Sequence, residues 1–196
     1  TIQSNKPRTQ NTQKRTRINK FYMKHKAAFP KLTSQAIMSP MSGITDVAFR
    51  TLCRQYGAGL TYTEFVNGTA ITRAKTNSIK SILTNPIEKP AAVQLFGTNI
   101  QDIIEAAQIL EKKFDIIDVN CGCPAWKVIK TGAGSEMLKH PEQIATFVNK
   151  LASAVSKPIT VKIRIGIDEK HINAVQVAKL AEDAGAAAIT IHGRTQ

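Results

Sequence analysis

The chain has 196 residues, of which 42% are hydrophobic, and this composition is typical of a folded domain with a buried core. The sequence contains no run of about 18 apolar residues, the length that is needed to span a bilayer, and its N-terminal segment has no apolar secretion signal. We therefore expect neither a membrane protein nor a secreted one. Three cysteines are too few for a disulfide framework, which favours a cytoplasmic protein.

The formal net charge of +13 is concentrated near the N-terminus. Residues 1–31 contain nine Lys or Arg and no acidic residue, which leaves 18 basic and 14 acidic residues in the rest of the chain. We predict a basic, disordered arm over residues 1–31 and a globular domain over residues 32–196. The arm could be a solvated leader or an electrostatic tether for RNA, and a translation start at Met23 is a third interpretation.

From residue 35 onward, short apolar runs alternate with amphipathic segments. We predict six strands, at residues 35–40, 60–64, 91–96, 116–120, 159–164 and 187–192. The interval between strand starts suits parallel strands joined by crossover helices. A (βα) barrel and a doubly wound sheet both fit, and in both the ligand site lies at the carboxyl ends of the strands.

Amphipathic helices are predicted between the strands. Asp46 can cap the first helix and Gly57 can end it. The apolar face of this helix comprises Ala48, Phe49, Leu52, Cys53 and Tyr56. We expect Cys53 to be a core residue. The helix after Thr98 has an apolar face of Ile100, Ile103, Ile104, Ala107 and Leu110. The helix after Asp168 has an apolar face of Ile172, Val175, Leu180, Ala181 and Ala184. A further helix is expected to begin near Pro141, and we interpret residues 130–142 as a mobile active-site loop before it.

Polar side chains gather where the predicted strands end, and packing gives no reason for Gln, Asn, Lys and His at these positions. The set comprises Ser39, Ser42, Glu64, Gln94, Asn120, Cys121, Cys123, Lys162, Arg164, His192 and Arg194. We interpret it as a binding site. No GxGxxG follows the first strand and no GxxxxGK[ST] occurs, so neither a Rossmann dinucleotide site nor a P-loop is supported.

Cys121 and Cys123 could be a metal clip, a redox pair, packing residues or a catalytic acid. A zinc site is disfavoured, because Cys-x-Cys lacks the usual two-residue gap and no second ligand pair follows at finger spacing. His140 alone cannot complete such a site. We expect no metal.

Six segments, in this order and at these spacings, resemble the flavin-dependent tRNA-dihydrouridine synthases: PMSGITDVAFR, TEFV, VQLFG, DVNCGCPAWKVIKTGAGSEML, PITVKIRIG and ITIHGRT. The resemblance covers about residues 35–196. It implies an α/β fold of the TIM (βα)8 type that binds FMN and reduces the C5–C6 double bond of uridines in tRNA. The implied enzyme is an oxidoreductase acting on CH–CH bonds, with NAD(P)H, expected to be NADPH, as reductant and tRNA as partner. We expect the protein to be a monomer.

In such enzymes a hydride reaches C6 of uracil and a cysteine protonates C5, and the Asn-x-Gly-Cys-Pro motif places this acid at Cys123. An unperturbed thiol has a pKa of about 8.5, so it holds its proton at neutral pH and can act as a general acid. The same resemblance implies flavin contacts from Pro40, Met41, Ser42, Gln94, Asn120, Lys162 and His192. It implies substrate contacts from Asn120, Lys127, Lys130 and Arg194.

A full barrel has eight strands, whereas six are predicted here. We therefore expect an incomplete barrel without the family's flavin-phosphate loop and helical tRNA-binding domain, and poor FMN binding by this chain alone. Two alternatives stay open: a dihydroorotate dehydrogenase-like flavoenzyme, and a catalytically inactive RNA-binding fragment that uses the basic arm. The first is disfavoured because its Asn-x-Ser-x-Pro-Asn motif is not matched, since Ala125 follows Pro124.

Overall fold

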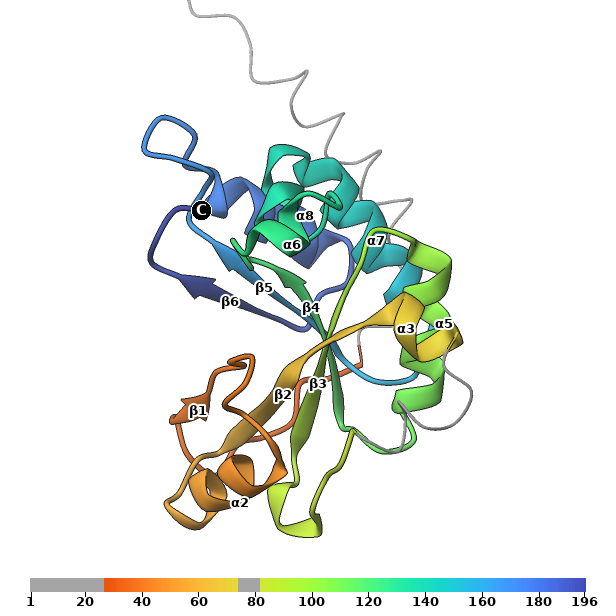
Figure 1. The fold of residues 1–196 in the computed structure, drawn as a ribbon, viewed down its shortest axis with the longest axis vertical. Helices are drawn as coiled ribbons and strands as arrows, with labels where there is room; N and C mark the ends of the chain where they lie inside the picture. The colour runs from red at the N-terminus through yellow and green to blue at the C-terminus, as the bar shows by residue number, and fades with distance from the viewer. Residues whose placement is uncertain (1–26, 74–81) are drawn as a thin grey trace, which may run out of the picture.

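The computed structural model describes residues 27–73 and 82–196. In these ranges a single parallel sheet has its strands in chain order: β1 Ile37–Met38, β2 Leu60–Asn67, β3 Ala91–Phe96, β4 Ile116–Cys121, β5 Ile159–Arg164 and β6 Ala188–His192. The sheet is curled, and its two edge strands lie on the same side of the view in Figure 1. A doubly wound sheet would reverse its strand order at a switch point. The predicted barrel-type α/β fold, incomplete at six strands, is therefore confirmed for the described residues.

The six strands lie where the apolar runs predict them, with changes at their ends. β1 contains only two of the six predicted residues, whereas β2 continues three residues beyond its predicted end. The helices are α2 Val47–Gln55, α3 Gly68–Arg73, α5 Ile100–Leu110, α6 Trp126–Ile129, α7 Pro141–Ala154 and α8 Ala174–Asp183, and the 3-10 helices are η1 Pro86–Glu88 and η2 Gly134–Lys139. None of the helices in the described ranges is long and apolar enough to cross a membrane.

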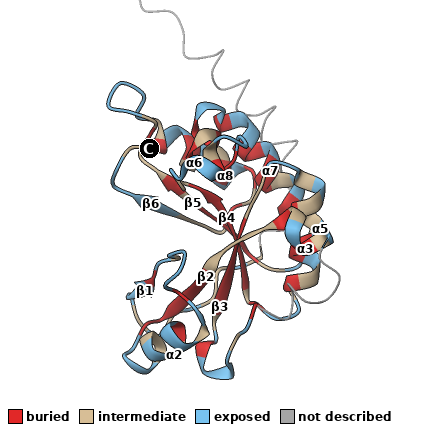
Figure 2. Ribbon diagram, in the orientation of Figure 1, coloured by how far each residue is buried: buried red, intermediate tan, exposed pale blue. Residues whose placement is uncertain are grey.

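The two faces of the sheet have different cores. The larger core lies between the strands and helices α5, α7 and α8, and Figure 2 shows the buried residues concentrated there and along the strands. A smaller cluster of Leu60, Tyr62, Ala92 and Ile116 lies on the inner face, and Phe29, from the end of the predicted arm, packs against it. Most of the predicted arm, residues 1–26, lies outside the described residues.

Strand β4 shows how these faces alternate. Ile117, Val119 and Cys121 belong to the core beneath the helices, whereas Ile116 belongs to the inner cluster. Because successive side chains of a strand point to opposite faces, Asp118 and Asn120 share the inner face with Ile116. The inner face therefore becomes polar toward the carboxyl ends of the strands.

Helix α2 is capped as predicted, because the Asp46 carboxylate accepts a hydrogen bond from the Phe49 amide at 2.8 Å. Its predicted apolar face is wrong, since Cys53 is only half-buried and the other members are exposed: Ala48, Phe49, Leu52 and Tyr56. Arg50 is the buried residue instead, because its guanidinium pairs with the buried Glu88 carboxylate at 2.8 Å and donates to two backbone carbonyls. This buried ion pair fixes which side of α2 faces the protein.

The other two predicted apolar faces differ in outcome. In α5 the prediction is confirmed, with Ile103, Ala107 and Leu110 buried. In α8 it is partly wrong, because the helix begins only at Ala174 and both Ile172 and Val175 are exposed. The buried side of α8 comprises Ala174, Val177 and Ala181.

Candidate active site

A cavity of about 420 Å³ lies at the carboxyl ends of the strands, where the sequence predicts the site. Seven of the predicted site residues line it: Pro40, Met41, Gln94, Asn120, Cys123, Lys162 and His192. Four other predicted residues do not line it and are exposed: Ser42, Lys127, Lys130 and Arg194. The structure thus brings together the residues from the ends of β3, β4, β5 and β6 with the segment after β1.

The cavity also contains residues that the site prediction missed. Arg164 and Phe65 both line the cavity. Arg164 belongs to the polar residues that the sequence places at the strand ends, whereas nothing in the sequence indicates that Phe65 lies at the site. The register between β2 and β3 shifts between Tyr62 and Phe65, so the simple alternation of the strand does not hold there. Phe65 consequently lines the cavity, where its ring packs edge-on against Phe96 with 4.9 Å between ring centroids.

The backbone around Cys123 is held on both sides. The Asn120 Oδ1 atom accepts hydrogen bonds from the amides of Gly122 at 3.1 Å and Cys123 at 2.9 Å. The amide and the hydroxyl of Ser135 both donate to the Cys123 carbonyl, each at 3.0 Å. Arg164 Nε donates to the Gly122 carbonyl at 2.8 Å. The half-buried Cys123 therefore lines the cavity from a segment whose position is fixed by five hydrogen bonds.

Residues 130–142, interpreted from the sequence as an active-site loop, are partly helical and partly buried. Residues 134–139 of the segment form η2, and Ala133, Gly134, Ser135, Met137 and Leu138 are buried. Ser135 faces the Cys123 carbonyl, whereas Met137 and Leu138 enter the large core. The segment therefore supports the Cys123 backbone through the two hydrogen bonds from Ser135.

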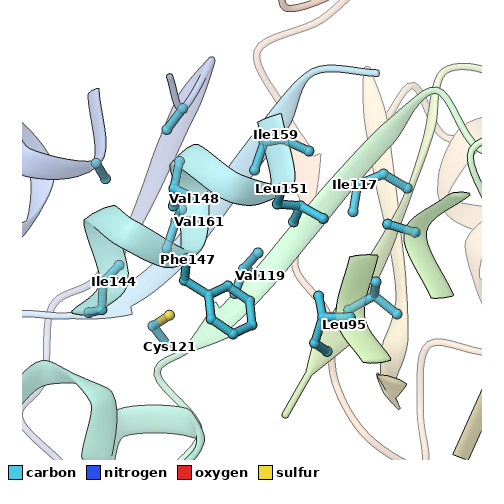
Figure 3. Packing of buried hydrophobic residues seen from close by; sticks show 14 of the residues in the cluster. Leu95, Ile117, Val119, Cys121, Ile144, Phe147, Val148, Leu151, Ile159 and Val161 are labelled. Atoms are coloured by element: carbon cyan, nitrogen blue, oxygen red, sulfur yellow. The ribbon is translucent and has the colours of Figure 1, made fainter. Parts of the chain in front are cut away.

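Cys121 and Cys123 occupy different environments. Cys121 is fully buried in the core beneath the helices, where Figure 3 shows it with Val119 and Phe147. Burial raises the pKa of its thiol well above the ordinary value, and the negative charge of Asp118 raises it further. Of the interpretations open for this cysteine, the structure supports a packing residue of the larger core. Within the described ranges, no group of three or more His, Cys, Asp and Glu side chains could hold a metal ion.

Residues 37–196 match the family model described as dihydrouridine synthase. This match covers most of the chain and all six strands. The chain belongs to the dihydrouridine synthase family. The family predicted from the sequence motifs is thus confirmed.

Curated relatives agree with this family assignment. The chain is 39% identical over 167 residues to the tRNA-dihydrouridine synthase B of Pasteurella multocida, and 39% identical over 170 residues to the protein of that name in Escherichia coli K12. Each alignment covers 85% of this chain, but only 50% and 52% of the respective relative. The chain therefore spans about half the length of the curated relatives it matches.

Several charges meet at the cavity of this dihydrouridine synthase family member. Burial lowers the pKa of the Lys162 ammonium, an effect that Asp118 partly offsets and Arg164 reinforces. Loss of hydration, followed by the positive charges of Arg164, Lys162 and Arg194, lowers the pKa of His192. Arg194 thus adds to the positive potential at the cavity without lining it. Such a potential favours an anionic ligand or a developing negative charge.

Asp118 makes the stability of the folded chain depend on pH. Burial raises its pKa from the ordinary 3.8 to about 6, against the opposing effects of Thr160, Gln94 and Lys162. The unfolded chain therefore loses this proton first as the pH rises, and the contribution of Asp118 to stability is lost between about pH 4 and pH 6. The shift corresponds to about 3 kcal/mol.

We therefore expect the wild-type protein to lose about 3 kcal/mol of stability relative to Asp118→Asn between pH 4 and pH 7. Urea unfolding of both proteins across this range measures the difference, and the asparagine variant is the control because it cannot titrate. A difference that does not change with pH would show that Asp118 has an ordinary pKa in the folded state.

Proposed function

We propose that the chain carries the uridine-reducing site of an FMN-dependent tRNA-dihydrouridine synthase that uses NADPH as reductant. The observation that carries this proposal is the Cys123 backbone, held by Asn120 and Ser135 so that the residue lines the strand-end cavity, in a chain of the dihydrouridine synthase family. The substrate would be a uridine of tRNA and the product dihydrouridine, formed in the cytoplasm by a monomer.

The lining of the cavity fits a flavin ring, which has flat apolar faces and a polar edge. Met41 and Phe65 offer apolar contact, Gln94 offers a buried side-chain amide, and Lys162 and Arg164 offer positive charge. In the proposed arrangement the backbone of Pro40, Met41 and the adjacent Ser42, together with His192, completes the contacts. Bound FMN would supply the hydride that reaches C6 of uracil.

Cys123 would act as the general acid that donates its thiol proton to C5 of uracil. Its hydrogen-bonded backbone would hold the Cys123 Cα atom in place as the uracil enters, so little backbone reorganisation would precede proton transfer. Lys162 and Arg164 would stabilise negative charge that develops nearby, in a site partly shielded from water. After transfer, the thiolate must regain a proton before the next cycle.

A uridine in folded tRNA is stacked, so it must leave its stack to reach this cavity. We propose that Lys127, Lys130 and Arg194 contact tRNA phosphates, because all three are exposed and positively charged. Asn120 lines the cavity and would contact the uracil or the flavin. The basic residues 1–31 would add an electrostatic contribution to tRNA binding.

Unmodified tRNA, incubated with NADPH and the protein as its gene encodes it, tests the proposed function. Mass spectrometry of the nucleosides from the digested tRNA should show dihydrouridine, which has two more hydrogen atoms than uridine. Oxidation of free dihydroorotate without any product in tRNA would instead indicate the dihydroorotate dehydrogenase alternative. Salt-sensitive tRNA binding without product, unchanged by Cys123→Ala, would indicate an RNA-binding protein.

A further inference from the structure

Asp118 is a fully buried acid on the inner face of β4 that does not itself line the cavity. One carboxylate oxygen accepts a hydrogen bond from the Thr160 hydroxyl, and the other accepts one from Gln94 Nε2 at 2.6 Å. No cation of the described residues forms an ion pair with it. A buried carboxylate without an ion pair is costly, so the contacts that it makes call for a functional explanation.

The hydrogen bonds of Asp118 continue as a chain to the backbone amides of Gly122 and Cys123. Because an ionised carboxylate can only accept, Gln94 must turn its amide nitrogen toward Asp118 and its Oε1 atom away. That oxygen accepts from Asn120 Nδ2 at 2.8 Å, which turns Asn120 Oδ1 toward the amides of Gly122 and Cys123. The two ends of this chain have fixed polarity, since backbone amides can only donate. Reversing the Gln94 amide would place its oxygen against the Asp118 carboxylate, and reversing the Asn120 amide would place its nitrogen against the backbone N–H groups of Gly122 and Cys123.

The same orientation decides what the two amides offer to a ligand. Each amide nitrogen carries two hydrogens, and the chain of hydrogen bonds uses one of them. Within the part of the chain that the structure describes, neither nitrogen has a second protein acceptor. Gln94 and Asn120 both line the cavity, so each keeps one N–H for a ring carbonyl or ring nitrogen bound there. Reversed amides would offer oxygen atoms instead.

We propose that Asp118 is a positioning residue that acts through Gln94 and Asn120, fixing the Cys123 backbone and setting the cavity to present N–H donors. The inference deepens the proposed function and rests on it for its catalytic consequence. The orientation of the two amides can be measured independently of that function, because it requires neither tRNA nor flavin.

Three substitutions distinguish the loss of the hydrogen-bond acceptor for Gln94 from other changes at the Asp118 carboxylate. Asp118→Leu removes the acceptor at similar volume. Asp118→Asn keeps an oxygen for Gln94, because the Thr160 hydroxyl can turn to accept from the new amide. Thr160→Val is the matched control, since it removes the other partner of the same carboxylate and leaves the Gln94 contact in place.

We expect single-turnover dihydrouridine formation to fall about 100-fold in Asp118→Leu, the size of effect that misplaced catalytic groups produce. Asp118→Asn should stay within about fivefold of wild type and Thr160→Val within about threefold, since the acceptor for Gln94 remains. Each assay uses the protein as its gene encodes it, with saturating tRNA. Equal losses in Asp118→Leu and Thr160→Val would overturn the proposal, because any disturbance of the carboxylate would then have the same effect.

Nuclear magnetic resonance of the side-chain amides gives the readout that does not depend on activity. In ¹⁵N-labelled protein, one hydrogen on each amide of Gln94 and Asn120 should exchange slowly with water in wild type, Asp118→Asn and Thr160→Val. Exchange should be at least about tenfold faster in Asp118→Leu, which loses the acceptor. If that variant does not fold, fast exchange of both amides in the wild type, or a 100-fold loss in Asp118→Asn, would overturn the proposal. Absence of dihydrouridine in every protein would sink only the proposed function, since the exchange result stands separately.

Discussion

Replacing Cys123 with alanine is expected to lower the rate of dihydrouridine formation by about 10²–10⁴-fold, the range that a positioned general acid contributes. The structure supplies the physical reason, because Cys123 lines the cavity while five hydrogen bonds hold the backbone of residues 122 and 123. Alanine keeps this backbone but cannot donate a proton. Single-turnover conversion of unmodified tRNA, with flavin content measured in parallel, gives the rate.

Cys121→Ala is the matched control for this experiment. Cys121 is fully buried beneath the helices and contacts the Met137 sulfur at 3.7 Å. Loss of its sulfur should cost about 1 kcal/mol of stability and leave the reaction rate nearly unchanged. Equal rate losses in the two variants would contradict the assignment of the acid to Cys123 and return the two cysteines to a functional pair.

Gly134→Ala is expected to destabilise the protein and to slow the reaction, whereas Gly132→Ala should do only the former. Both glycines have positive φ, of +65° and +84°, so alanine costs about 1 kcal/mol of backbone strain at either position. At Gly134 the added Cβ atom would also lie 2.5 Å from the Cys123 carbonyl oxygen, whereas at Gly132 the nearest atom is a Thr98 methyl at 3.4 Å.

We expect the clash at Gly134 to displace the Cys123 carbonyl relative to Ser135, which adds about 2 kcal/mol and shifts the acid. Urea unfolding gives the two stabilities, and the tRNA assay gives the two rates. Gly134→Ala should lose at least about tenfold in rate more than Gly132→Ala, because a small misplacement of a catalytic group is costly. Similar rates in both variants would show that the position of the Cys123 carbonyl does not limit the reaction.

The strands could be predicted from the sequence because each is a short apolar run with β-branched residues, and the parallel order followed from the spacing between them. The apolar face of α2 could not be predicted in the same way. Its orientation depends on the ion pair between Arg50 and Glu88, which are 38 residues apart in the chain. Local periodicity contains no information about such a distant partner.

The core of the candidate site was predictable for a related reason. Gln94, Asn120 and Lys162 are polar where strands otherwise carry apolar residues, and parallel topology places such strand ends at one edge. Phe65 was missed because a register shift within β2 turns it toward the cavity. Asp118 was visible as an acid within an apolar strand, but its role depends on the hydrogen-bonded chain through Gln94, which only the structure places.

The most direct test of the central claim is made in a bacterial strain that lacks its own dihydrouridine synthases. The gene that encodes this chain, expressed in full, should restore dihydrouridine to the tRNA of that strain, measured by nucleoside mass spectrometry. The same gene with Cys123→Ala should produce the folded protein but no more than about a hundredth of that dihydrouridine at early times. Transfer RNA without dihydrouridine, in cells that contain the folded wild-type protein, would contradict the account.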